Sequence, residues 1–285
     1  MEESCSSTIA LKGYTHAISN YRPVSLVSCV SKVLERVVHK HMYNYILDNE
    51  LLYKYQSGFL TCHSTIFQLV ELYDNVCQNL ESRKHTCLVF CDISKAFYGI
   101  WNSGLLHKFK SFGFNGIFHS CLGSYLNNRK QVLLLNNTVA NEGFLNVGVP
   151  QGSVLGPLLF LLYIYDIADD LESLARLFAD NTSLSYSSTS TIDIETKINH
   201  DLERLQGWSE KWLTTFNPTK TEVLIISNSE NGSDMNLRFN NSRLELSTVH
   251  VHLGVTFSND TKWANPIDGI YKSCSNKVVV LRNMF

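Results

Sequence analysis

Residues 176–186 read RLFADNTSLSY, and this pattern predicts a β-hairpin. The runs 176–179 and 182–186 have the composition of short strands, and the polar pair Asp180-Asn181 between them is expected at the tip. A second apolar run, residues 86–91, predicts a strand that ends in Asp92. If these strands are neighbours in one sheet, the carboxylates of Asp92 and Asp180 meet at adjoining strand ends.

The spacing of apolar residues predicts the other elements. Helical spacing is found at residues 24–52, 65–80, 105–112, from the end of the glycine-rich segment 148–152 to about 171, and at 194–212. Strand patterns are found at residues 131–135 with 139–147 as a hairpin, at 222–227, at 237–246 as a second hairpin, and at 249–257. Residues 1–20 show no recognisable element. From residue 86 onward this order predicts an α+β fold, a split β-α-β arrangement with an antiparallel sheet and helices on one face.

Composition narrows the class of protein. A chain of 285 residues with 44% hydrophobic content can hold one large domain or two subdomains. The formal net charge is −2, so nucleic-acid binding would need a local groove with acidic residues segregated elsewhere. Eight cysteines occur without a CxxC pair, which favours reduced thiols over zinc or disulfides. Neither a secretory signal nor an apolar run of membrane-spanning length is found, so we expect a soluble intracellular protein, nuclear or cytoplasmic.

Two aspartates at adjoining strand ends have a specific chemical use. Paired carboxylates are the oxygen ligands that a two-magnesium phosphoryl-transfer site requires, because the ions hold the attacking and leaving oxygens. Taken alone, either Asp92 or Asp180 reads more often as a structural cap or a solvated turn residue. The surrounding motifs decide between these interpretations.

Six motifs occur in a fixed order along the chain. They are NYRPVSL (20–26), CDISKAF (91–97), GVPQGSVLGPL (148–158), FADNT (178–182), FNPTKT (216–221) and HLGV (252–255). Together they closely resemble the reverse transcriptase domain of non-LTR retrotransposons, especially the jockey-like group, from about residue 18 to the end. The resemblance implies the fingers and palm of a right-hand polymerase fold, with the palm an antiparallel sheet backed by helices and a truncated thumb.

The resemblance also implies a division of the chain. It gives an irregular N-terminal segment at 1–20, helical fingers at 21–86, a palm with a fingers insertion at 87–258, and the start of a truncated thumb at 259–285. The implied activity is extension of a DNA primer 3′-OH with dNTPs on an RNA template. We expect no membrane association and no stable protein partner.

The resemblance places the metal site by position. Asp92 and Asp180 match the family's metal-binding aspartates, and they imply two Mg²⁺ ions, for which Mn²⁺ is a substitute. Asn181 would be a third, weaker ligand. Lys220 matches a lysine that protonates the pyrophosphate leaving group. The alternative is a solvated lysine in a loop, which would look identical in sequence.

Nucleotide contacts are implied at four further positions. Arg22 matches a residue that contacts the triphosphate, with a surface salt bridge as the alternative. Phe97 matches the aromatic ring that excludes a 2′-OH, with a core ring as the alternative. Gln151 and Gly152 match the loop along the template and incoming base, where glycine allows close backbone approach.

Primer and template contacts are implied at Pro150, Leu253 and Gly254. Pro150 stiffens the entry to the loop, and the pair Leu253-Gly254 resembles the primer-grip turn, with an ordinary strand bend as the alternative.

The chain departs from the family pattern at the proposed metal site. The family's hairpin reads Phe-Ala-Asp-Asp, and here the second acid is Asn181, which removes a full negative charge. Further departures are Leu60, Tyr98, Asn102 and Tyr165. Three hypotheses therefore stand: a reverse transcriptase with impaired activity, a catalytically dead relic, and a domesticated nucleic-acid-binding or interaction scaffold.

Overall fold

The structure is a computed structural model that describes residues 4–10, 21–135, 138–217, 220–227 and 235–260. Contacts within the chain define two compact units, each described here by itself. Unit 1 comprises Met1–Thr61, Ile93–Asp169 and Gly207–Phe216. Unit 2 comprises Cys62–Asp92, Asp170–Gln206 and Asn217–Phe285. Helices and sheets both contribute, as expected for an α+β fold.

Unit 2 is built on a five-stranded sheet in the order β12-β9-β3-β8-β7. Its strands are β3 (His85–Asp92), β7 (Leu174–Phe178), β8 (Asn181–Ser188), β9 (Glu222–Ile226) and β12 (Leu246–Ser247). All neighbouring pairs are antiparallel except β12 with β9, which is parallel. The predicted hairpin at 176–186 and the predicted strand at 86–91 are therefore neighbours.

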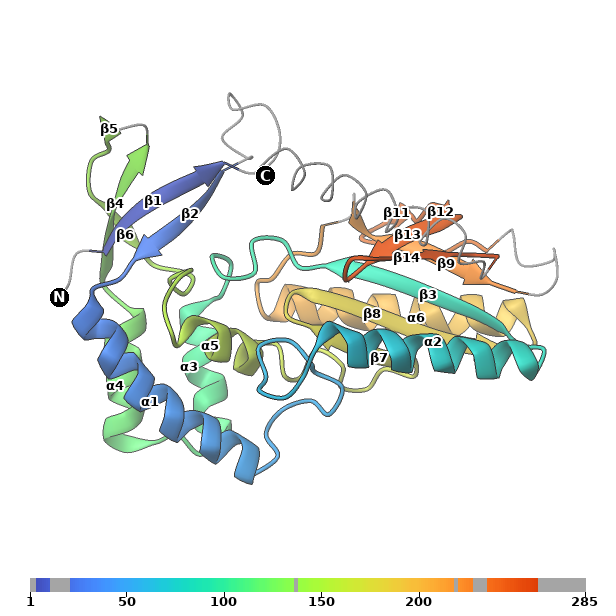
Figure 1. Cartoon of the computed structure of the whole chain (residues 1–285), viewed down its shortest axis with the longest axis horizontal. Coiled ribbons are helices and arrows are strands. Elements are labelled where there is room, and N and C mark those ends of the chain that lie inside the picture. The colour runs from blue at the N-terminus through green and yellow to red at the C-terminus, as the bar shows by residue number, and fades with distance from the viewer. Residues whose placement is uncertain (1–3, 11–20, 136–137, 218–219, 228–234, 261–285) are drawn as a thin grey trace, which may run out of the picture. The chain divides into compact units, whose positions relative to one another are not determined.

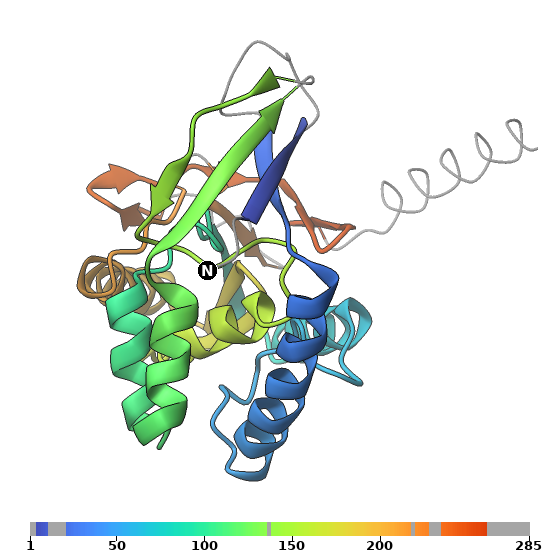
Figure 2. The ribbon, with the colours of Figure 1, turned by 90° about the vertical axis from the view of Figure 1, so that its left-hand side faces the viewer.

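The sheet has a helix on each face, where the sequence pattern predicted helices on one face. Side chains of successive strand residues point to opposite faces, and Ser185 of β8 contacts Asn75 of α2 (Thr65–Glu81), while Tyr186 contacts Asp193 of α6 (Thr191–Lys211). The two views of the ribbon agree that the sheet lies between α2 and α6 (Figure 1, Figure 2). The difference arises because β3 is buried along both faces, which a run of consecutive apolar residues permits.

A β-hairpin extends the cover on the α2 face. Strands β13 (Val249–His252) and β14 (Val255–Ser258) replace the single strand predicted at 249–257. Leu253 and Gly254 both have positive φ, 49° and 86°, as a two-residue hairpin turn requires. The core on this face joins α2, β3, β9 and β14 through Leu72, Val76, Leu88, Phe90, Leu224, Ile226 and Phe257. A shorter hairpin, β10 (Arg238–Phe239) with β11 (Ser242–Arg243), agrees with the prediction at 237–246.

Unit 1 combines four helices with a second sheet. The helices are α1 (Cys29–Asp48), α3 (Asn102–Ser111), α4 (Gly116–Leu126) and α5 (Gly156–Tyr163). The strands are β1 (Ser4–Ala10), β2 (Tyr21–Leu26), β4 (Arg129–Leu135), β5 (Thr138–Val139) and β6 (Gly143–Leu145). Figure 2 shows α3 and α4 side by side below this sheet.

Three predictions for unit 1 were wrong in extent. Residues 1–20 were expected to be irregular, but β1 lies within them and pairs with β2 and with β4. The helix predicted from residue 24 begins at Cys29, because 21–26 are held as a strand by β1 and the side chain of Ser28 caps the helix by accepting the N–H of Ser31. The helix predicted to reach residue 171 ends at Tyr163.

Two buried charged groups tie the helices of unit 1 together. The carboxylate of Glu35, on α1, accepts the backbone N–H groups of Val154 and Leu155, the two residues immediately before α5 (2.5 and 3.1 Å). A negative charge is favourable there because the N-terminus of a helix carries a partial positive charge. Within the residues that the structure describes, no helix is both long and apolar enough to cross a membrane.

The second buried charge is Lys108, whose side chain is 2% exposed. Its Nζ donates to the carbonyl of Tyr163 and to Asp166 Oδ1, each at 2.5 Å, and lies 3.8 Å from the ring centroid of Trp212. Trp208 Nε1 also donates to Asp166 Oδ1 (2.8 Å). Burial, opposed by the attraction of Asp166, lowers the pKa of Lys108 to about 8.

Candidate active site

The register between β3 and β8 places Asp92 directly opposite Asn181. Residues opposite each other in an antiparallel pair have Cα atoms about 4.5–5.5 Å apart. Phe178 also pairs with Asn181, so the hairpin tip consists of Ala179 and Asp180, and not of Asp180 and Asn181 as predicted. Ala179 has φ 55°, as the first residue of a type II′ turn does. Asp180 therefore lies one residue from the cross-strand partner of Asp92.

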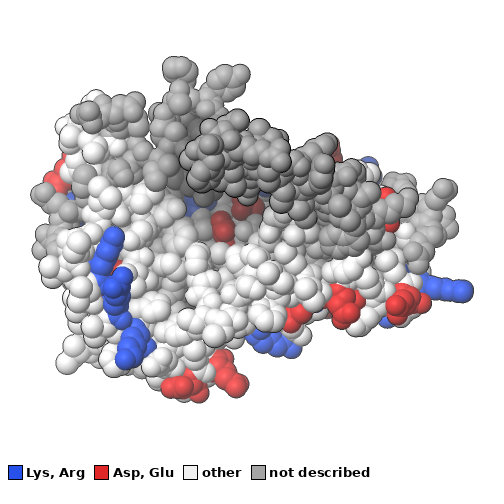
Figure 3. Space-filling model, in the orientation of Figure 1, with Lys and Arg blue, Asp and Glu red and all other residues white. Residues whose placement is uncertain are grey.

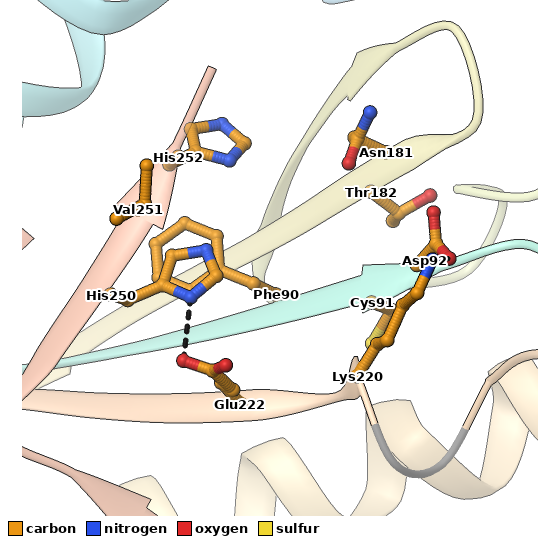
Figure 4. Close-up of a pocket in the computed structure, with 10 residues that line it drawn as sticks. All are labelled: Phe90, Cys91, Asp92, Asn181, Thr182, Lys220, Glu222, His250, Val251 and His252. Carbon is orange, nitrogen blue, oxygen red and sulfur yellow. Dashed lines mark hydrogen bonds and ion pairs between the residues drawn. The ribbon is translucent and has the colours of Figure 1, made fainter. Parts of the chain in front are cut away.

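Asp92 lines a pocket of about 270 Å³ within unit 2 (Figure 4). The lining residues are Phe90, Cys91, Asp92, Asn181, Thr182, Lys220, Glu222, His250, Val251 and His252. Lys220 Nζ donates to Asp92 Oδ2 at 2.8 Å, so two residues predicted for catalysis are in contact. Asp180 is not among the lining residues, and its Oδ1 accepts Asn181 Nδ2 at 3.5 Å.

The sequence interpretation missed Glu222, His250 and His252, which line this pocket. His250 Nδ1 and Glu222 Oε2 lie 2.8 Å apart, and the ring of His250 stacks on Phe90 at 3.9 Å between centroids (Figure 4). His252 is buried, and its burial, with the nearby charge of His250, lowers its pKa to about 4. The alternation Val-His-Val-His was the available signal, because residues two apart on a strand share a face.

The oxygen donors near the strand ends are two carboxylates and one amide. Asp92, Asp180 and Asn181 offer hard ligands of the kind that Mg²⁺ prefers. Among the described residues, no three His, Cys, Asp or Glu side chains are grouped in a way that could hold a metal ion. The donor set therefore fits one hard divalent cation in chemical type, but carries little negative charge for two.

The loop predicted to lie along the template is fixed in unit 1 against β2. The carbonyl of Gln151 accepts the N–H of Ser25 at 2.7 Å. Gly152 has φ 111°, and a Cβ there would lie 2.8 Å from the carbonyl oxygen of Ser25, so only glycine fits. Arg22 lies on the same strand, three residues before Ser25. The structure thus brings together the segments that carry Arg22, Gln151 and Gly152.

Phe97 joins the same loop through its backbone. Its carbonyl accepts the N–H of Val149 at 2.8 Å, next to Pro150. The ring of Phe97 is half-buried and packs near Phe160, with centroids 5.5 Å apart. Tyr98, one of the departures from the family pattern, donates its hydroxyl hydrogen bond to Gln151 Oε1. This contact occupies the side-chain oxygen of Gln151, a residue of the loop predicted to lie along the template and incoming base.

The helices α1 and α2 carry exposed side chains of opposite charge. On α1, Lys32, Arg36 and Lys40 recur at four-residue spacing, and Figure 3 shows a row of Lys and Arg side chains over this helix. The only acid in the first five turns of α1, Glu35, is buried. On α2, the acidic residues are exposed instead (Figure 3). The near-zero net charge therefore conceals a local basic row on α1.

Comparison with known proteins identifies the family. The profile of the family described as "Reverse transcriptase (RNA-dependent DNA polymerase)" matches residues 12–257. The chain is 32% identical over 210 residues to a probable RNA-directed DNA polymerase from transposon BS of Drosophila melanogaster, covering 71% of the chain and 23% of that protein. It is 26% identical over 269 residues to the RNA-directed DNA polymerase from mobile element jockey of the same species, covering 92% of the chain and 29% of that protein. The chain thus spans about a quarter of the length of these relatives.

Solved structures agree on the fold. Apo telomerase from Candida tropicalis superposes with a TM-score of 0.59 at 10% identity, over 91% of this chain and 48% of that one. Telomerase from Candida albicans, in complex with a fragment of telomeric RNA, gives a TM-score of 0.51 at 12% identity, over 92% and 46%. The family profile matches most of the chain, and the relatives and the fold agree with it. The chain belongs to the reverse transcriptase family.

Proposed function

We propose that this chain is the RNA-directed DNA polymerase domain of a non-LTR mobile element, which extends a DNA primer 3′-OH with dNTPs on an RNA template. The observation that carries the proposal is the register that sets Asp92 opposite Asn181, the residue next to Asp180, with Lys220 in contact with Asp92. Carboxylates at adjoining strand ends serve phosphoryl transfer, in which the protein mainly supplies position and charge.

Each residue of the strand ends has a proposed task. The family generally uses divalent metals, typically Mg²⁺; Asp92, Asp180 and the Asn181 carbonyl would hold the metal, which when bound stabilises charge on the reacting phosphate oxygens. Lys220, 58% exposed and 2.8 Å from Asp92, would donate a proton to the leaving pyrophosphate. His250 and His252, which line the pocket, belong to the hairpin whose turn is Leu253-Gly254, the proposed primer grip.

Unit 1 would supply the nucleotide and template contacts. Arg22 would bind the triphosphate, Phe97 would exclude a 2′-OH, and Pro150, Gln151 and Gly152 would lie along the template and incoming base. The row Lys32, Arg36 and Lys40 on α1 supports a nucleic-acid substrate, because basic residues at regular spacing neutralise backbone phosphates. The telomerase neighbour solved with telomeric RNA supports an RNA template.

The proposal includes the division into parts read from the sequence. Residues 21–86 would form the fingers and 87–258 the palm with a fingers insertion, after a segment at 1–20 that includes β1. The expected start of the thumb at 259–285 lies, from residue 261 on, outside the described residues. Mn²⁺ would serve as a substitute for Mg²⁺. The protein would work inside the cell, in nucleus or cytoplasm, without a stable protein partner.

A second hypothesis is a scaffold that has lost catalysis. One observation favours it: Asn181 presents an amide N–H to Asp180, where the family has a carboxylate. Loss of one preorganised contact in an active site costs about 10²–10³ in rate. Under this hypothesis the fold and any weak nucleic-acid binding remain while polymerisation does not.

Primer extension on poly(rA)/oligo(dT) with Mg²⁺ or Mn²⁺ separates the two hypotheses. The chain as given is compared with Asn181→Asp, with Asp92→Ala, and with Asp74→Ala, a control that removes an exposed aspartate from α2. We expect weak extension by the given chain, stronger extension by Asn181→Asp by about 10²-fold or more, none by Asp92→Ala, and no change in Asp74→Ala. If neither the given chain nor Asn181→Asp extends the primer, the proposed activity is wrong.

A further inference from the structure

Both aspartates of the strand ends already have partners within the chain. Asp92 Oδ2 accepts a hydrogen bond from Lys220 Nζ at 2.8 Å, and Asp180 Oδ1 accepts one from Asn181 Nδ2 at 3.5 Å. One partner is a cation and the other is an amide donor. Each therefore faces a carboxylate oxygen that a divalent ion would otherwise take.

Asn181 changes this site in two ways. Relative to an acid it removes a negative charge, and its NH₂ group adds a donor that an aspartate does not have. A carboxylate at position 181 would repel Asp180 unless a cation lay between them, whereas the amide satisfies Asp180 without a cation. The side chain at this position therefore decides whether the site needs a second ion.

The charges at the site lead to the same result. At the strand ends, Asp92 and Asp180 contribute two negative charges and Lys220 one positive charge, so these three side chains sum to −1, whereas an acid at 181 would give −2. Glu222, which also lines the pocket, is paired with His250. From this balance, and resting on the proposed polymerase site, we infer that the site binds one divalent cation. Asn181 takes the place of the second cation from within the chain, and Lys220 neutralises part of the charge that attracts the first.

The two internal partners contribute unequally. The Lys220 side chain is 58% exposed, and an exposed ion pair is worth little, so removing its charge strengthens divalent binding by no more than about fivefold. Adding a carboxylate at 181 raises the ligand charge itself, which we expect to tighten binding by about tenfold or more and to create a second ion position. Asn181 therefore decides the number of ions, and Lys220 adjusts the affinity.

The test measures Mn²⁺ bound to the whole chain by the loss of the free-ion signal in electron paramagnetic resonance, without nucleotide, primer or template. The variants are Asn181→Asp, Asn181→Ala, Lys220→Gln and Asp92→Asn. Lys84→Gln, which removes an exposed lysine of unit 2, is the matched control. Circular dichroism of each variant verifies folding.

We expect one Mn²⁺ for the given chain, two for Asn181→Asp, one of up to about fivefold higher affinity for Lys220→Gln, and none for Asp92→Asn. Asn181→Ala should still bind one ion, since it adds no charge, and Lys84→Gln should match the given chain. Two ions on the given chain, with the affinity found in Asn181→Asp, would overturn the inference. Asn181→Asp could fail to fold. In that case weaker or unchanged Mn²⁺ binding in Lys220→Gln would overturn the effect of Lys220 on affinity. Two ions bound to the given chain would still overturn the inference that the site binds one ion.

The result is independent of polymerisation. If Asn181→Asp binds two ions but extends no primer, the proposed function fails while this inference stands. If the given chain binds two ions and extends primers, the inference fails while the proposed function stands.

Discussion

Replacing Lys108 with methionine should destabilise unit 1 strongly. The ammonium is almost fully buried, contacts Asp166 at 2.5 Å and lies over the ring of Trp212. Methionine retains the alkyl chain but leaves the carboxylate of Asp166, 14% exposed, without the ammonium. The hydrogen bond from the indole N–H of Trp208 remains. Breaking a buried pair by removing one member costs about 3–5 kcal/mol, because the other charge stays buried without compensation.

Urea unfolding followed by tryptophan fluorescence measures this loss. Trp208 and Trp212 surround the ammonium, so their emission reports on the affected unit. With a slope of about 2 kcal/mol per molar urea, a loss of about 4 kcal/mol moves the midpoint by roughly 2 M. Lys110→Met, at an exposed position two residues further along the same helix, is the matched control and should move it little.

A double variant separates the ion pair from simple loss of packing. Asp166→Asn keeps an acceptor for Trp208 while removing the charge, so Lys108→Met with Asp166→Asn should recover about 2 kcal/mol of the loss, within the range of coupling between contacting residues.

Raising the pH gives a second check. The folded pKa of Lys108, about 8, lies below its unfolded value near 10.5, so the unfolded state binds more protons between these values. The stability difference between the given chain and Lys108→Met should therefore grow from pH 8 to 10.5. A loss below about 0.5 kcal/mol in Lys108→Met, typical of surface changes, would refute the reasoning.

Two further predictions concern other buried groups. The pKa of His252 is about 4 in the folded state, below its unfolded value near 6.5. The contribution of neutral His252 to the free energy of unfolding is therefore present above pH 6.5 and is lost as the pH falls toward 4, by about 3 kcal/mol in total. Chemical unfolding at pH 7 and pH 4.5 should show a smaller pH dependence for His252→Phe than for the given chain, and an equal dependence would contradict the assignment. Glu35→Gln keeps the shape of the side chain but removes the charge next to the N-terminus of α5. Thermal unfolding should show a loss of about 1–2 kcal/mol in the free energy of unfolding. An unchanged midpoint would count against this electrostatic explanation.

The sequence predicted the parts of the fold that depend on local pattern. The strand ending in Asp92 and the hairpin carrying Asp180 were found from short apolar runs and a polar tip, and their pairing is confirmed. The position of the tip was wrong by one residue, because both Asp180-Asn181 and Ala179-Asp180 look acceptable until cross-strand register is known. Register is fixed by pairing across the sheet, which a single strand's sequence does not contain.

Non-local contacts account for most of what the sequence did not predict. Strand β1 has a serine-rich sequence of low strand propensity and forms through pairing with β2 and β4, the latter more than 100 residues away. The same holds for the contact of Tyr98 with Gln151 and of His250 with Glu222, which join residues from separate elements. The proposed roles of Arg22, Phe97 and Lys220 came from the resemblance alone and remain predictions.

The tight turn at Ala179 and Asp180 restricts how this site can change through evolution. With two residues between Phe178 and Asn181, the hairpin has no spare length, so deleting or inserting one residue in β8 would exchange the inward and outward faces of the whole strand. Replacement of an acid by asparagine alters one side chain and leaves every neighbour in place. Single substitutions can therefore change the chemistry of this hairpin while the fold persists, whereas insertion or deletion of one residue there would disrupt the sheet.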